Sequence, residues 1–234
     1  MTLLLTLLLP ILAQAQGAAW RSYSAQLPEE DQKILAHIAS LGAFDPDRAG
    51  PYGKVGKKDG ILSLEAFVRV PGELQKAIPM AKDFSSYKDW VLQRINERRD
   101  GKGRYLVDIQ SMEHFKEEGL LKVWVRFNVL FKGRYFLRLR IDDRLSDPLA
   151  PYLGLKLNKP TKLAPKGQGY FKLYAPHGSK EFVVYFYGDA KPHWAIYYLL
   201  PLSVFQSEAV GRIQAILDNI LLRLQHLGAL GTPA

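Results

Sequence analysis

Two alternating segments around a glycine turn constrain the fold most strongly. Between positions 122 and 131, every second residue is apolar, and the face so formed consists of Val123, Val125, Phe127, Val129 and Phe131. After Lys132-Gly133 the alternation resumes, with Tyr135, Leu137, Leu139 and Ile141 on one face. A period of two predicts half-buried β-strands, and the short glycine connection predicts an antiparallel hairpin. The chain therefore needs a sheet that packs one face on a core.

The opposite face of this hairpin is basic. Its charged residues are Lys122, Arg126, Arg134, Arg138 and Arg140, and Trp124 and Phe136 share the face. The whole chain has a formal net charge of +9, which favours anionic partners. This basic surface predicts contact with an anionic membrane surface. Coverage by an N-terminal helix or by another protein is the alternative, because exposed apolar groups commonly mark such contacts.

The remaining patterns place more strands before a long C-terminal helix. Strands are expected at 61–70, 104–112, 153–158, 168–175, 181–188 and 193–199, helices at 28–41, 72–80, 86–98 and 203–227, and a loop at 44–60. The last helix has an apolar stripe that includes Ile213, Leu217 and Leu224. A curved antiparallel sheet must cover its apolar concave face, and this helix is long enough to do so. The fold class predicted is therefore α+β, with the sheet wrapped around the C-terminal helix in a helix-grip arrangement.

The first residues are typical of an export signal. An apolar run extends to Leu12 and is followed by Ala13-Gln14-Ala15 and by Gly17-Ala18-Ala19. Small residues after an apolar run form the site that signal peptidase cleaves. We therefore expect residues 1–19 to be a cleaved signal peptide and the mature protein to be periplasmic or secreted. Residues 20–59 are then an N-terminal extension of one helix and a loop.

A short segment between the expected helices resembles a known superfamily. Asp83-Phe84-Ser85-Ser86-Tyr87-Lys88-Asp89-Trp90 is similar to the "D-F-x-x-Y-x-x-W" segment of the START-like (SRPBCC) polyketide cyclases and lipid-transfer proteins, and Pro201-Leu202 before the last helix also resembles that family. The resemblance implies a START-like domain over residues 60–230. It also implies an elongated cavity between sheet and helix that holds sterols, phospholipids, fatty acids or aromatic polyketides.

Apolar side chains near such a cavity are candidates to line it. The candidates are Phe127, Tyr135, Tyr185, Tyr187, Trp194, Tyr198 and Leu217. Aromatic residues in sheets also commonly fill cores, so core packing is the alternative for each of them.

The search for catalytic chemistry finds few candidates. The chain has no cysteine, its five histidines are isolated without metal-ligand spacing, and it has no G-x-S-x-G elbow. We therefore expect no metal and no cofactor, and we expect binding ahead of catalysis. Export in turn predicts that nucleic acid is not a partner. The leading hypothesis is an exported carrier of a lipid or other apolar molecule. A cyclase-like or hydrolase-like enzyme using Tyr185, Tyr187 or Arg126, and an interaction module with a filled cavity, remain the alternatives.

Overall fold

The computed structural model describes residues 17–44, 51–97, 105–128, 133–161 and 164–228. Within them an eight-stranded antiparallel sheet has the order β1-β2-β8-β7-β6-β5-β4-β3. The strands are β1 Tyr52–Lys58, β2 Ile61–Pro71, β3 Val107–Phe115, β4 Leu120–Phe127, β5 Gly133–Arg144, β6 Tyr152–Leu157, β7 Lys166–Tyr174 and β8 Glu181–Lys191. Strands β3 to β8 pair in the order in which they follow one another in the chain. Strand β2 pairs with β8, and β1 pairs with β2 at the edge of the sheet.

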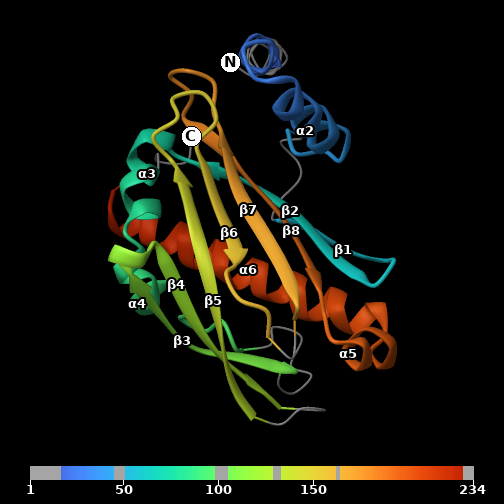
Figure 1. Cartoon of the computed structure of the whole chain (residues 1–234). Helices are drawn as coiled ribbons and strands as arrows, with labels where there is room; N and C mark the ends of the chain where they lie inside the picture. The colour runs from blue at the N-terminus through green and yellow to red at the C-terminus, as the bar shows by residue number, and fades with distance from the viewer. Residues whose placement is uncertain (1–16, 45–50, 98–104, 129–132, 162–163, 229–234) are drawn as a thin grey trace, which may run out of the picture.

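Helices cover both faces of this sheet. The long helix α6 (Leu202–His226) lies across the concave face, behind the strands in the view of Figure 1. It is preceded by α5 (Trp194–Leu199), while α3 (Leu74–Lys82) and α4 (Tyr87–Trp90) connect β2 to β3. Helical residues 17–24 and α2 (Glu29–Ser40) pack on the outer face near one end of the sheet. The predicted α+β helix-grip class is therefore confirmed.

The sequence-based loop at 44–60 is wrong over its second half, because β1 is a strand paired with β2. Glycine and lysine made this segment look like a loop. The close approach of α6 explains one of the glycines: a Cβ added at Gly53 would lie 3.0 Å from Val210 Cγ2. The sheet therefore begins at Tyr52, inside the region 20–59 that we expected to be an extension.

The strand expected at 193–199 is also wrong, since these residues form the helix α5. The side chain of His193 caps this helix by accepting a hydrogen bond from the backbone N–H of Ala195 at 3.3 Å. Short apolar runs fit a strand and a buried helical turn equally well, so periodicity alone does not separate them. Because this segment is a helix and not a strand, the aromatic side chains that face the interior differ from those expected.

The concave face packs on α3, α4 and α6 through the larger apolar core. Val68, Val184 and Leu173 from the sheet lie in one cluster with Leu217 and Leu224 of α6. Phe84 and Trp90 from the family-like segment belong to the same cluster. That segment therefore contributes core side chains at the end of the sheet where α3 and α4 pack.

A second core joins the N-terminal helices to the outer face. Trp20, Tyr23, Leu35 and Ile38 are buried in one cluster that also contains Phe67, Tyr174, Val183 and Tyr185 from the sheet. At its centre the buried carboxylate of Asp31 accepts hydrogen bonds from Lys172 Nζ at 2.7 Å and from Tyr174 Oη at 2.6 Å. The N-terminal helices are therefore an integral layer of the fold.

Candidate functional site

An apolar pocket of about 400 Å³ lies between the concave face and the helices α5 and α6. Strands β1, β2, β3, β4, β7 and β8 contribute to its walls, which are formed by Val55, Leu62, Ser63, Leu64, Leu106, Val107, Phe127, Gln168, Phe186, Gly188, Asp189, Ala190, Ile196, Leu200, Phe205, Glu208, Ala209 and Arg212. Most of these side chains are aliphatic or aromatic. Such a cavity suits an apolar molecule, and a few polar groups are enough to orient it.

Small residues on β7 and β8 lie beside the pocket. Gly169 lies opposite Gly188, and Gly167 lies opposite Ala190, and these four positions form a small-residue patch. The ring of Phe186 leans over the first pair, so that a Cβ added at Gly188 would lie 3.0 Å from Phe186 Cζ. The two glycines of that pair therefore leave room for the Phe186 ring, and Gly188 and Ala190 of the patch line the pocket.

A second, smaller pocket of about 190 Å³ lies on the same side of the sheet among residues of the larger core. Phe186 lines the first pocket and Phe171 lines the second. The two rings pack against each other with their centroids 4.7 Å apart. This pair therefore forms part of the partition between the two apolar spaces.

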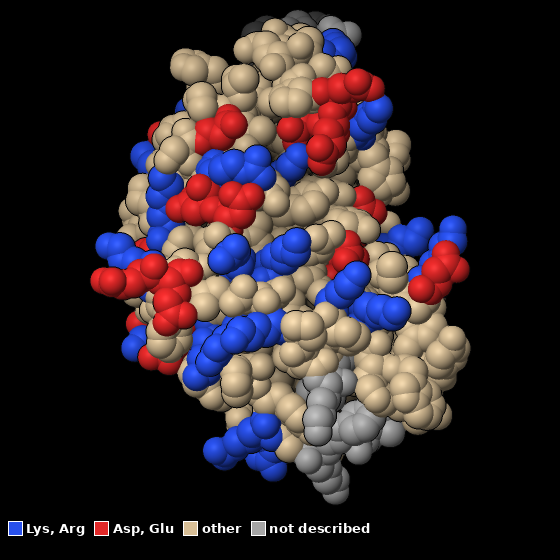
Figure 2. Space-filling model, in the orientation of Figure 1, with Lys and Arg blue, Asp and Glu red and all other residues tan. Residues whose placement is uncertain are grey.

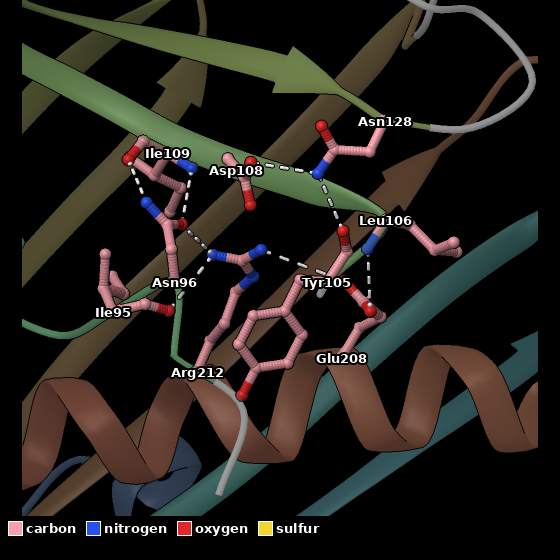
Figure 3. Close-up of polar contacts among 9 residues, drawn as sticks. All are labelled: Ile95, Asn96, Tyr105, Leu106, Asp108, Ile109, Asn128, Glu208 and Arg212. Carbon is pink, nitrogen blue, oxygen red and sulfur yellow. Dashed lines mark hydrogen bonds and ion pairs between the residues drawn. The ribbon is translucent and has the colours of Figure 1, made fainter. Parts of the chain in front are cut away.

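One wall of the first pocket is polar and is centred on Arg212 of α6 (Figure 3). Nη1 of Arg212 donates to Asn96 Oδ1 at 3.1 Å and to the carbonyl of Ile95 at 3.4 Å. The Asn96 amide in turn bonds the backbone of Ile109 on the edge strand β3, accepting from its N–H at 2.9 Å and donating to its carbonyl at 2.8 Å. This chain of bonds ties the edge of the sheet to α6 and satisfies edge groups that would otherwise be open.

Glu208 completes this wall. Its Oε1 accepts from the backbone N–H of Leu106 at 3.0 Å, and its Oε2 lies 3.8 Å from Arg212 Nη2. The guanidinium also lies 4.3 Å from the ring centre of Tyr105. Burial lowers the pKa of Arg212, although the nearby carboxylate of Glu208 opposes this effect. Among the described residues, no acceptor lies within hydrogen-bond distance of Nη2, whose contact with Glu208 is the ion pair at 3.8 Å.

The sequence-predicted cavity residues fall into three groups. Phe127 lines the first pocket, Tyr135 packs edge-on against Phe127 at 5.7 Å, and Leu217 is buried in the larger core. Tyr185 and Tyr187 instead lie in the second core, called the outer core below, which joins the N-terminal helices to the outer face of the sheet. Trp194 and Tyr198 are 66% and 73% exposed. Of these seven residues, Phe127 lines the first pocket, and the other six are not among the residues that form its walls.

The physical reason for the misplaced tyrosines is that β8 is covered on both faces. Val184 and Phe186 face α6, while Val183 and Tyr185 face the N-terminal helices, so both sets of alternate residues are apolar. The Tyr185 hydroxyl donates to Glu65 Oε1 at 3.1 Å, and burial together with this carboxylate raises the pKa of Tyr185. Alternation cannot identify the cavity side of such a strand.

The basic surface on β4 and β5 is arranged as neighbouring pairs across the two strands. Lys122 lies opposite Arg138, and Arg126 lies opposite Arg134; Arg140 follows on the same face. Figure 2 shows Lys and Arg side chains distributed over this face of the molecule. Acidic residues of β3 lie at its edge, with Asp108 opposite Arg126 and Glu113 opposite Lys122.

Aromatic groups interleave with these charges. Trp124 lies opposite Phe136, and Lys122 Nζ lies 4.3 Å and 4.9 Å from the centres of their rings. Cation–π contact of this kind holds the ammonium over the rings. The basic surface therefore also offers exposed apolar area, since Phe136 is 46% exposed.

Two searches of the described part of the chain gave negative results. In those residues, no group of three or more His, Asp or Glu side chains is placed to hold a metal ion. Within the same ranges, no helix has both the length and the apolar character needed to span a bilayer.

Comparison with solved structures identifies the architecture. A STAR-related lipid transfer protein fragment from Xanthomonas axonopodis superposes with a TM-score of 0.51 at 10% identity, over 74% of this chain and 95% of that one. The chain has the START-like fold. A START superfamily protein from Mycobacterium smegmatis gives a TM-score of 0.46 at 13% identity, covering 70% of this chain and 98% of that one. At these identities the START-like likeness concerns the fold alone. In sequence, the chain matches no family model and no curated protein.

Proposed function

We propose that this START-like protein binds an apolar small molecule or a lipid in the first pocket. The observation that carries the proposal is an apolar space of about 400 Å³ with the charged side chains of Glu208 and Arg212 on one wall, while Asp189 of β8 also lines it. Ligand pockets commonly have volumes of about 300–1,000 Å³ and combine apolar walls with a few polar groups. The START-like fold of a lipid transfer protein is compatible with this use.

The polar wall indicates how a ligand would be oriented. An apolar body would lie against the aliphatic and aromatic walls of the pocket, and a polar group of the ligand would lie toward the wall that holds Glu208 and Arg212. Polar groups at this wall favour such an orientation, because leaving a buried polar group unpaired costs about 1–3 kcal/mol. The pocket therefore favours an amphipathic molecule with one polar group over a pure hydrocarbon.

The two alternative functions are less well supported. Catalysis by Tyr185, Tyr187 or Arg126 would require these side chains at the substrate, but the two tyrosines belong to the outer core and Arg126 shares the outer face with Arg134. An interaction module with a filled cavity would not need a pocket of about 400 Å³. Binding without chemistry is therefore the function that we propose.

Native mass spectrometry of the protein purified from its own source tests this proposal directly. A stoichiometric apolar molecule, identified after organic extraction, is expected to remain bound. A clean apo mass that does not change after incubation with a membrane lipid extract would contradict the binding function.

Filling the pocket is expected to abolish binding. Ala209 of α6 lines the pocket, and Ala209→Phe places a ring in the ligand's space while retaining the helix. We expect the co-purified molecule to be lost and the affinity for anilinonaphthalene sulfonate, an apolar dye with one anionic group, to fall by about tenfold or more. Leu222→Phe is the matched control, because it introduces a ring at an exposed position of the same helix. Equal dye affinity in both variants would place the binding site elsewhere.

We also infer that the chain is exported, on the strength of the apolar run and small residues near its start. Residues 1–16 lie outside the described structure, whereas Trp20 and Tyr23 are buried in the outer core. Sequencing of the N-terminus of the exported protein is expected to give Gln16 or Trp20 as the first residue. A mature chain that starts after Tyr23 is not expected, because it would lack core side chains. Retention of uncleaved chain in the cytoplasm would contradict export.

The basic surface is part of the same proposal. Lys122, Arg126, Arg134, Arg138 and Arg140 add to a net charge of +9, and such a field attracts anionic surfaces over about one Debye length, roughly 8 Å at physiological salt. We propose that this attraction brings the protein near an anionic membrane.

A further inference from the structure

Helix α5 has large apolar side chains exposed to solvent. Trp194, Tyr198 and Leu199 are 66%, 73% and 60% exposed, and Leu202 at the start of α6 is 43% exposed. The other side of α5 is buried through Ala195, Ile196 and Tyr197. Contiguous exposed apolar groups of this kind mark an interaction site.

Lysines lie at the strand ends next to this apolar corner. Lys191 at the end of β8 lies opposite Lys166 of β7, and Lys58 lies opposite the exposed Ile61 in the hairpin of β1 and β2. Asp59, in the turn of that hairpin, and Asp189 of β8 are the acidic neighbours. Figure 2 shows mostly uncharged surface at the corner where Figure 1 places α5. Trp, Tyr and Leu flanked by Lys is the composition found where proteins meet the membrane–water interface.

The same helix forms part of the pocket wall. Ile196 of α5 and Leu200 directly after it line the first pocket. Lys57 Nζ donates to the carbonyl of Leu200 at 3.1 Å and lies 4.7 Å from the centre of the Tyr197 ring. One short helix thus has apolar side chains in solvent on one side and against the proposed ligand space on the other.

We propose that α5 docks on a phospholipid bilayer that contains anionic lipids, with Trp194, Tyr198 and Leu199 in the interfacial region and Lys58, Lys166 and Lys191 at the headgroups. Tyr and Trp suit this zone because each combines an apolar ring with a polar group. Docking would bring the pocket wall to the membrane, where an apolar ligand can be exchanged without crossing water.

The charges favour a membrane over a second copy of the chain. Two copies joined through α5 would bring Lys58, Lys166 and Lys191 of each toward those of the other, and like charges oppose such contact. Anionic headgroups instead attract these lysines, by about 1 kcal/mol for each basic residue near the surface, which corresponds to about fivefold in affinity.

Vesicle flotation with delipidated protein tests this docking. With vesicles of phosphatidylcholine and phosphatidylserine, we expect the double variant W194A/Y198A to lose about tenfold or more in partitioning. The double variant K58Q/K191Q should lose about fivefold per lysine, and only on vesicles that contain phosphatidylserine. Phe136→Ala is the matched control, because it removes an exposed ring from the basic surface on β5. Circular dichroism of each variant should match the parent, since the replaced side chains are exposed.

Several outcomes would overturn the proposal. Unchanged partitioning of W194A/Y198A would exclude α5 as the docking element. Loss of partitioning in Phe136→Ala, with W194A/Y198A unaffected, would move the contact to the basic surface. A dimer that depends on Trp194 would identify a second copy as the occupant. Although the value of docking rests on the proposed ligand function, Ala209→Phe should bind vesicles normally, so failure of docking and failure of ligand binding can be distinguished.

Discussion

Replacing Asp31 by alanine is expected to destabilise the protein by about 3–5 kcal/mol, the usual cost of removing one partner from a buried ion pair. The variant leaves Lys172 charged and buried, since its side chain is 10% exposed and its other carboxylate partner, Glu30, is largely in solvent. The Tyr174 hydroxyl would also lose the carboxylate that accepts its hydrogen bond. Denaturant unfolding measures this loss, and a change below about 1 kcal/mol would show that the network is not a main source of stability.

A charge-free triple variant is the control for this prediction. D31L/K172M/Y174F removes both charges and the hydroxyl while keeping apolar volume between α2 and β7. Buried ion pairs replaced by apolar groups of similar size are often neutral in stability, so this variant should recover most of what Asp31→Ala loses. If the triple variant is as unstable as Asp31→Ala, the effect comes from packing rather than from the unpaired lysine.

High pH is expected to unfold the protein through its buried tyrosines. Burial raises the pKa of Tyr23, Tyr87 and Tyr174 well above the ordinary value of 10.0, and Asp31 contributes to the shift of Tyr174. The neutral form is thus favoured in the folded state. Its contribution to stability is fully present below pH 10 and is lost as the pH rises above 10, because the unfolded chain releases these protons first. At one pH unit above the ordinary pKa, each such tyrosine costs about 1.4 kcal/mol.

The unfolding free energy between pH 8 and pH 11.5 measures this effect. These three tyrosines together should remove about 4 kcal/mol by pH 11, which is a large part of the 5–15 kcal/mol of an ordinary domain. Tyr87→Phe should make the decline shallower by one tyrosine's share. Tyr198→Phe is the control, because that side chain is 73% exposed and its removal should leave the slope unchanged. A slope that is equal in all variants would attribute the decline to lysine titration.

Local sequence patterns were sufficient to predict the elements that have one face exposed to solvent. In β4 and β5 the inner face is apolar and the outer face is basic, so a period of two identified both strands and their pairing. The apolar stripe of α6 likewise gave its position and length, with expected bounds of 203–227 and observed bounds of Leu202–His226. In these elements the solvent boundary is visible in the sequence.

Elements whose surroundings depend on distant segments were not predictable in the same way. Position 53 in strand β1 is a glycine where α6 passes close to it, and Tyr185 faces outward because the N-terminal helices cover β8. Neither partner is near in sequence. A local pattern therefore assigned the first to a loop and left the cavity side of the second undetermined.

The polar wall of the pocket was missed for a related reason. Glu208 and Arg212 are spaced four residues apart on α6, as many exposed helical ion pairs are. Their functional interest comes from Leu106 and Asn96, which the tertiary fold brings to them. The available signal was a charged pair at helical spacing on α6, and this signal does not reveal the partners.

The small-residue patch on β7 and β8 has a consequence for how binding capacity is inherited. Gly188 and Ala190 line the pocket with almost no side chain, while the sheet order and α6 depend on other residues. A lineage can therefore resize the pocket in methyl-sized steps while the architecture persists. A descendant with Leu at 190 would keep the outline of this protein and have a smaller pocket.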